Sequence, residues 1–267
     1  MNAPVRHRPG ALPLPSTPPF AGLLCAGLLL APSLSAQTGT GVGGSPLKVP
    51  ETISASAGGA PGNAPSWAVE GVPPAVWILV EAASATSDQD EAKGLYLDAE
   101  DEARRGVAAR PDEVGTRFAL AVVLGLRADV EGGRTKVRAA AALHEELTAI
   151  LAMEPEHARA RHMLGRLHAG VMRMNGVVRW VATRLLGGDV LDDASWGEAE
   201  RHLAFAEERD PEMLGHHLQL ANLYRDTDRS NLALIELTHL FEREPTSEME
   251  RAAWDEAVEL RAALGGG

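Results

Sequence analysis

The sequence predicts an all-α fold in which antiparallel helix pairs stack side by side as an α-solenoid and a C-terminal helix caps the array. Over most of the chain beyond residue 67, apolar residues recur at intervals of three and four, the period of an amphipathic helix. Prolines follow the ends of several of these segments, and aromatic residues make up only 4% of the chain. Because the β-branched and aromatic runs typical of strands are scarce, we expect no sheet.

The first 36 residues have the order of a secretory signal peptide. Arg6 and Arg8 precede an apolar run at residues 20–31, and small residues lead up to Ala36. This run is shorter than the roughly 20 residues that a transmembrane helix needs. We therefore expect cleavage near Ala36 and export to a periplasm or to the outside of the cell. An uncleaved signal anchor, which would tether the protein to a membrane, is the alternative.

Residues 37–66 are rich in Gly, Ser, Ala, Pro and Thr, a composition typical of a flexible linker. The chain thus divides into a signal peptide at 1–36, a linker at 37–66 and a helical domain at 67–267. The single cysteine, Cys25, falls in the signal peptide. The mature domain would therefore hold neither a disulfide nor a thiolate metal site.

Start and stop signals divide the domain into successive helices. Polar residues at 87–88 and the pattern Ser195-Trp-Gly-Glu198 are typical helix caps, Gly132-Gly133 interrupts the chain, and a run of glycines closes it. A first helix is expected within 67–85, and the others at about 90–109, from 118 to the Gly132 break, and at 135–153, 156–172, 196–208, 213–225, 231–242 and 248–264.

The spacing of prolines gives the kind of repeat. Tetratricopeptide units are helix pairs of about 34 residues, with a small residue in the first helix and a proline after the second. Pro211 and Pro245 are 34 positions apart. Counted within their units, Gly165 and Ala221 both fall at the small-residue position. The spacings from Pro111 to Pro155 and from Pro155 to Pro211 are longer, so two units carry insertions, the larger near residues 171–190.

The order of these marks resembles the tetratricopeptide-like domain of the regulator of microtubule dynamics family, over about residues 91–264. The matching positions are Gly133, Thr135-Lys136-Val137, Glu154-Pro155, Leu164-Gly165, Trp180, Glu198-Ala199, Pro211 and the closing Glu256-Ala257-Val258-Glu259-Leu260. The resemblance implies the helical-repeat fold and a link to microtubules and membrane contact sites, with lipid binding in part of the family. A signal peptide argues against contact with tubulin, so the chain would be an exported, bacterial-type relative.

The first helix of each pair lines the concave face of such an array, and this face is the candidate groove for a partner. Eight residues fall at its lining positions: Phe118, Val122, Arg159, His162, Arg166, Leu218, Asn222 and Arg225. A groove that combines cations and apolar side chains suits an acidic peptide or an anionic amphiphile. The alternative is that the arginines pair with Asp and Glu of neighbouring helices.

The insertion at 171–190 is a second candidate surface. It is amphipathic and basic, and Arg173, Val177, Trp180 and Arg184 would form a lipid or membrane contact. The alternative is that this segment folds back and covers the core of the solenoid.

No catalytic motif occurs in the sequence. It lacks a P-loop, a nucleophile elbow and an HExxH pair, and the spacing of His157, His162 and His168 does not place three ligands on one helix face. We therefore predict no metal and no cofactor, and the net charge of −12 argues against nucleic acid. The function predicted is a non-catalytic binding or scaffolding module for a protein or peptide. A lipid-binding or lipid-transfer protein is the alternative, and the oligomeric state is left open.

Overall fold

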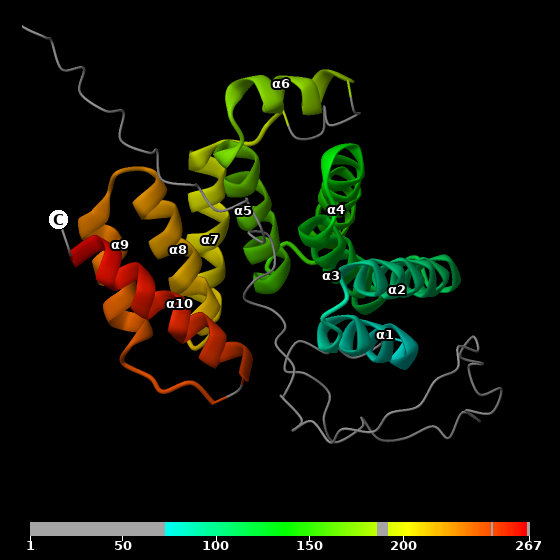
Figure 1. The fold of residues 1–267 in the computed structure, drawn as a ribbon, viewed down its shortest axis with the longest axis horizontal. Coiled ribbons are helices and arrows are strands. Elements are labelled where there is room, and N and C mark those ends of the chain that lie inside the picture. Colours follow the sequence, from blue (N-terminus) through cyan, green and yellow to red (C-terminus); the bar gives the residue numbers. More distant parts are fainter. Residues whose placement is uncertain (1–72, 186–191, 247, 266–267) are drawn as a thin grey trace, which may run out of the picture.

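The computed structural model describes residues 73–185, 192–246 and 248–265, and these residues form helices and connecting turns without a strand. This confirms the all-α class and the solenoid (Figure 1). The helices are α1 Pro74–Ala85, α2 Gln89–Ala109, α3 Val114–Val130, α4 Gly133–Met153, α5 Ala158–Arg173, α6 Gly176–Leu185, α7 Trp196–Arg209, α8 Leu214–Asp226, α9 Ser230–Leu240 and α10 Glu248–Gly265. The signal peptide and linker expected at 1–66 lie outside the described residues.

Neighbouring helices pack as antiparallel pairs, in the order α1 with α2, α3 with α4, α5 with α7, and α8 with α9. Helix α10 lies against α8 and α9, as expected of a capping helix. Helix α6 belongs to the predicted insertion and stands apart from the pairs at one end of α5 (Figure 1). None of the described helices is long and apolar enough to cross a membrane.

Polar side chains fix the starts of several helices where the sequence places them. Asp88 precedes α2 and accepts hydrogen bonds from the backbone N–H groups of Asp90 at 2.9 Å and Glu91 at 3.2 Å. Ser195 precedes α7 and accepts from the N–H of Glu198 at 3.1 Å. Each bond satisfies a donor that the first turn of a helix leaves unpaired. The similar cap expected at Ser247 lies outside the described residues.

The closest approach between two helices is at Gly165, where α5 meets α7. A Cβ atom on Gly165 would lie 2.7 Å from Cγ of Leu203 and 2.9 Å from the backbone oxygen of Ala199. Only glycine fits this crossing, and Gly165 stands at the small-residue position that the spacing of the prolines predicts for its unit. The predicted register of this unit is therefore confirmed, although the insertion separates its two helices.

Ion pairs also join one helix to another. Glu100 of α2 is buried and accepts from Arg104 on its own helix and from Arg127 of α3. Arg229, next to the start of α9, forms two bonds of 2.9 and 2.8 Å to the carboxylate of Glu200 on α7. Because two parallel bonds restrict orientation as well as distance, this pair fixes α9 against α7.

Candidate functional site

Helix α5 carries three of the predicted groove residues, Arg159, His162 and Arg166, on one side. Their spacing of three and four residues places them on successive turns of a helix. The start of α5 is fixed by His157, whose Nδ1 accepts a hydrogen bond of 3.1 Å from the N–H of Ala160. The ring of His157 also lies 5.0 Å from that of Phe118 on α3. We call Arg159, His162 and Arg166 the α5 basic face.

His162 sits in the middle of this face and is paired with His216 of α8. The two Nδ1 atoms are 2.8 Å apart and both rings are buried. One ring must donate its Nδ1 proton to the other, so the pair holds a single proton between these atoms. Burial is the largest cause that holds the pKa of His216 down to about 3, with the charges of His217 and Arg159 adding to it. Burial likewise holds the pKa of His162 well below 6.5.

The two arginines of the α5 basic face have no acidic partner among the described residues. Arg166 is 5% exposed, and its Nε has no hydrogen-bond partner there. Arg159 is half-buried and also forms no ion pair with a described residue. A buried charge is costly unless an opposite charge or several hydrogen bonds compensate it. Among the described residues, no neighbouring carboxylate neutralises these two arginines.

The other predicted groove residues take part in packing. Phe118 and Val122 of α3 are buried in the core formed by the first helices, and Leu218 of α8 is buried against the cap. Asn222 donates a bond of 2.9 Å from Nδ2 to Oε1 of Glu256 on α10. Arg225 is exposed and pairs with Asp226 at 2.8 Å. Partner binding by these five residues stays a prediction.

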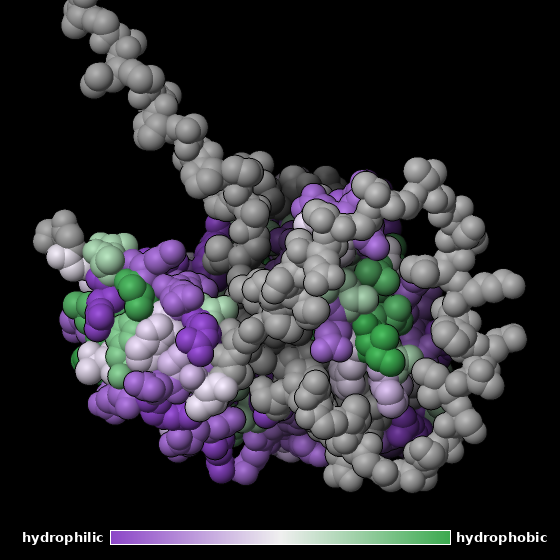
Figure 2. Space-filling view, turned by 60° about the horizontal axis from the view of Figure 1, so that its bottom comes forward, coloured by the Kyte–Doolittle hydropathy of each residue, from purple (hydrophilic) through white to green (hydrophobic). Residues whose placement is uncertain are grey.

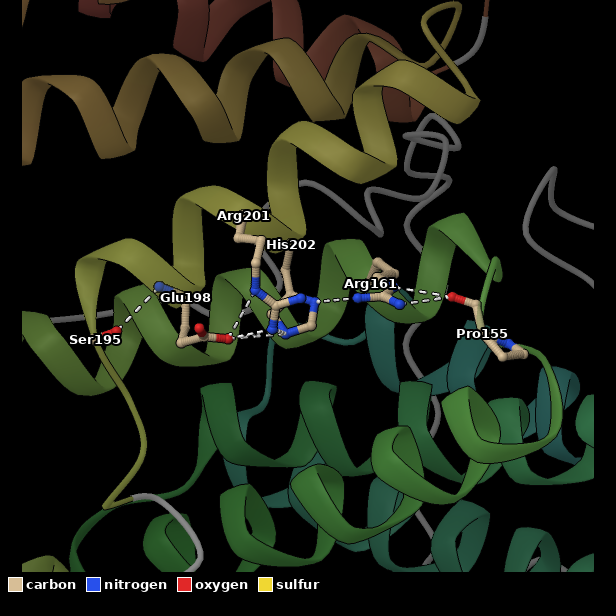
Figure 3. Close-up of polar contacts among 6 residues, drawn as sticks. All are labelled: Pro155, Arg161, Ser195, Glu198, Arg201 and His202. Carbon is tan, nitrogen blue, oxygen red and sulfur yellow. Dashed lines mark hydrogen bonds and ion pairs between the residues drawn. The ribbon is translucent and has the colours of Figure 1, made fainter.

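A second polar cluster lies between α5 and α7, and the sequence did not point to it (Figure 3). Arg161 of α5 donates to the backbone oxygen of Pro155 at 2.9 and 3.1 Å, and its Nη1 lies 3.4 Å from Nδ1 of His202. On the other side, Arg201 lies 3.2 Å from Nε2 of His202 and is ion-paired with Glu198. This cluster uses its charges internally and holds α7 against the start of α5.

Histidines continue along this interface toward α4. The ring of His168 lies 5.7 Å from that of His202 and 6.2 Å from that of His144. Burial, followed by the charge of His144, lowers the pKa of His168 to about 4. Burial, followed by the charge of Arg201, lowers the pKa of His202 to about 4. These rings are therefore uncharged at neutral pH. They contribute to packing between the helices and are poorly suited to proton transfer at that pH.

The insertion presents a different kind of surface. Trp180 of α6 is 57% exposed, and Arg184 on the same helix is exposed. Arg173 at the end of α5 donates from Nε to Asp226 at 2.6 Å, so this predicted contact residue is already paired within the protein. The side chain of Val177 lies outside the described residues. The lipid role of these four residues stays a prediction.

Comparison with known protein families identifies the family of this helical array. The profile described as regulator of microtubule dynamics protein 1-3 matches residues 73–265, which is well over half of the chain. The chain belongs to the regulator of microtubule dynamics family. No individual curated protein matches it.

Membership of the regulator of microtubule dynamics family confirms the resemblance that the sequence marks indicate. The match begins at residue 73 rather than near 91, so the family domain includes α1 and the whole of α2. It indicates a non-catalytic protein-interaction module. Within the part of this module that the structure describes, Arg159 and Arg166 of the α5 basic face are cations without an acidic partner.

Proposed function

We propose that the protein is a non-catalytic binding module that takes an acidic segment of a protein partner against the α5 basic face. The observation that carries this proposal is Arg166, whose guanidinium is buried and has no carboxylate partner among the described residues. A carboxylate of the partner would supply the missing counter-charge. Arg159 lies seven residues earlier, two helical turns away, and would bind a second acidic side chain of an extended segment.

The net charge of −12 does not oppose this proposal. At physiological ionic strength, charges more than about 8 Å apart in solvent are largely screened from one another. An acidic segment therefore responds mainly to the cations nearest to it. Carboxylates elsewhere on the protein instead disfavour binding away from the α5 basic face, which adds selectivity for this position.

The proposal is tested by fluorescence anisotropy with a labelled peptide of alternating glutamate and leucine. In the variant Arg166→Met, we expect affinity for this peptide to fall at least about tenfold, because a hydrogen bond to a charged group contributes about 1.5–3 kcal/mol. The same variant should unfold at equal or higher urea concentration than the wild type, since it removes an uncompensated buried charge. An arginine that only supports the fold would instead lose stability when replaced.

The matched control is Arg225→Met, which removes an exposed arginine that already pairs with Asp226. This variant should bind the peptide as the wild type does. A peptide in which lysine replaces glutamate should bind neither protein. Equal affinity of the wild type and Arg166→Met for the acidic peptide would remove the α5 basic face from the proposed site.

Lipid binding through α6 is the second candidate function, supported by the exposure of Trp180 and Arg184 on an amphipathic helix. It predicts that the domain sediments with vesicles that contain an anionic phospholipid, and that Trp180→Ser weakens this binding. It also predicts lipid in an organic extract of the purified domain, detected by mass spectrometry. A clean extract together with no sedimentation would exclude this function and leave the peptide proposal intact.

We also propose that the protein is exported. Support comes from the basic start, the apolar run at residues 20–31 and the small residues before Ala36, the order in which a signal peptide is built. Export would place the helical domain in a periplasm or outside the cell. The mass of the mature chain tests this proposal.

A further inference from the structure

The hairpin of α8 and α9 brings together three side chains that have no part in the α5 basic face. His217 is on α8, while Glu236 and His239 are on α9, three residues apart and therefore on one side of that helix. One nitrogen or oxygen from each lies within 4.8 Å of the other two. Residues 227–229 are the whole connection between the two helices, so the positions of these three residues are fixed by one tight hairpin.

The hydrogen bonds of His217 determine which of its nitrogens is available. Its Nε2 lies 3.1 Å from the backbone oxygen of Pro211. Because a carbonyl oxygen only accepts, Nε2 must carry a proton. The lone pair of the neutral ring is then on Nδ1, which lies 3.0 Å from Oε2 of Glu236. Nδ1 and the carboxylate are both acceptors in this state, so they need a cation between them.

A proton on Nδ1 is one such cation, and it would leave His217 and Glu236 as an ion pair. A proton, however, bridges only two atoms, so it would not bind His239 as well. A divalent transition ion at about 2.0–2.1 Å from nitrogen and oxygen ligands binds all three groups. His217 also donates its other ring N–H to a carbonyl, the contact that orients most metal-binding histidines.

We propose that His217, Glu236 and His239 form a binding site for Zn²⁺ or a similar divalent transition ion. Two imidazole nitrogens and one carboxylate suit such an ion better than Mg²⁺ or Ca²⁺, which prefer oxygen ligands alone. His217 is buried and Glu236 is 15% exposed in its side chain, whereas His239 is exposed. The ion would therefore enter from the solvent side, and rotation of His239 would complete the ligand set.

The sequence alone indicates no metal site, because the spacing of possible ligands along a single helix does not show which residues of two helices meet. The distance in sequence from His217 to Glu236 has no significance until the hairpin brings α8 and α9 together. Glu236 and His239 alone form only a pair on α9. The third ligand comes from the neighbouring helix, as is common for sites built between the helices of a bundle.

The site is tested with the full chain, freed of metal by chelation and titrated with Zn²⁺ by calorimetry at fixed pH. The wild type should bind one Zn²⁺ at this site. His239→Gln and Glu236→Gln should each weaken that binding by at least about tenfold, since even the loss of an outer-shell partner costs that much. His239 is exposed, so its replacement leaves the fold intact, and circular dichroism checks this. Co²⁺ should give visible absorption bands in the wild type that both variants lose.

The matched control is His144→Gln, which removes a half-buried histidine of α4 that lies outside this site. It should bind Zn²⁺ as tightly as the wild type. The proposal is overturned if the wild type binds no Zn²⁺, if His239→Gln or Glu236→Gln binds it as tightly as the wild type, or if His144→Gln loses as much affinity. A loss of Zn²⁺ affinity confined to Glu236→Gln would show that the bound ion does not use His239, and this would also overturn the three-ligand site.

Discussion

Gly165 and Arg166 are neighbours on α5 with opposite demands on their surroundings. Gly165 lies where α7 leaves no room for a side chain, because a Cβ atom would meet the backbone oxygen of Ala199 at 2.9 Å. Arg166 carries a long cationic side chain into a buried position without a described acidic partner. At the scale of single residues, the close packing at Gly165 contributes to stability, whereas the buried charge of Arg166 lowers stability unless a counter-charge compensates it.

The effect of a single methyl group at the α5 and α7 crossing is measurable. Gly165→Ala should lower the free energy of unfolding by about 1–3 kcal/mol, the usual cost of forcing extra volume into a packed interface. The backbone of α7 must move to relieve the contact with Ala199, because no side-chain rotation can. Urea unfolding followed by circular dichroism gives this difference directly.

The same substitution at Gly94 is the control, because that glycine lies within α2, is exposed and would place its Cβ in open space. Gly94→Ala should raise the free energy of unfolding by about 0.5–1 kcal/mol, since alanine loses less backbone entropy in a helix. If both substitutions shift the urea midpoint in the same direction, the close approach at Gly165 is not what determines the stability of this interface.

At the scale of elements, the interfaces that α5 shares with α4, α7 and α8 are rich in uncharged histidines. His162 and His216 share a hydrogen bond between α5 and α8, and His168 and His202 lie together between α5 and α7. Arg161, Arg166 and Arg201 add positive charge around them. A further proton on any of these rings would therefore be both buried and repelled, so acid should loosen these interfaces before others.

This gives a pH dependence with a definite sign. The pKa values of His168 and His202 are about 4 in the folded protein, against 6.5 for a solvated histidine, chiefly because of burial. Below pH 6.5, these two histidines therefore bind protons in the unfolded chain but stay neutral in the folded protein. The stability is complete above pH 7 and falls as the pH drops from 6.5 toward 4, by up to about 1.4 kcal/mol per pH unit for each such histidine.

Urea midpoints measured at pH 7.5, 6.5, 5.5 and 5.0 test this dependence in a range where most carboxylates stay ionised. In His168→Gln, the urea midpoint should change less over this range, because the variant lacks one histidine that binds a proton only in the unfolded chain. A midpoint that stays constant from pH 7.5 to 5.0 would show that the histidines remain as accessible to protons in the folded protein as in the unfolded chain.

The elements themselves are largely predictable from the sequence, because their signals are local. Capping at Ser195, the glycine at 165 and the prolines after helices each depend on a few neighbouring residues. Helix α3 begins at Val114, one turn before the expected start at Phe118, since Glu113 before it makes no side-chain cap that a pattern could show. Pairing between helices is different. Arg225 has an acidic partner and Arg166 has none among the described residues, and this difference depends on which carboxylates the packed helices bring near.

At the scale of the whole molecule, the described helices form one continuous array from α1 to α10, and the family match runs over the same length. Residues 1–66 precede this array and have a composition unlike it. The two proposals above together give a division of labour, in which the helical array would bind the partner and the N-terminal segment would determine where in the cell it does so. Each part can be tested without altering the other.

Export is tested by expressing the full chain in a bacterial host and fractionating the cells. We expect the protein in the periplasmic or extracellular fraction, with a mass that corresponds to a chain beginning near Gln37. Deletion of the apolar run at residues 20–31 should leave the protein in the cytoplasm at its full length. An intact chain found in the membrane fraction would instead support the uncleaved anchor, and a cytoplasmic wild type would contradict export.

The insertion between α5 and α7 also has a consequence for the order of folding. Residues 227–229 join α8 to α9, whereas residues 174–195 separate α5 from α7. Closing the longer connection costs about 2 kcal/mol more in chain entropy. The hairpin of α8 and α9 can therefore form early and on its own, while α5 and α7 gain their contacts late. The centre of the array, rather than its ends, would be the last part to acquire protection from hydrogen exchange during refolding.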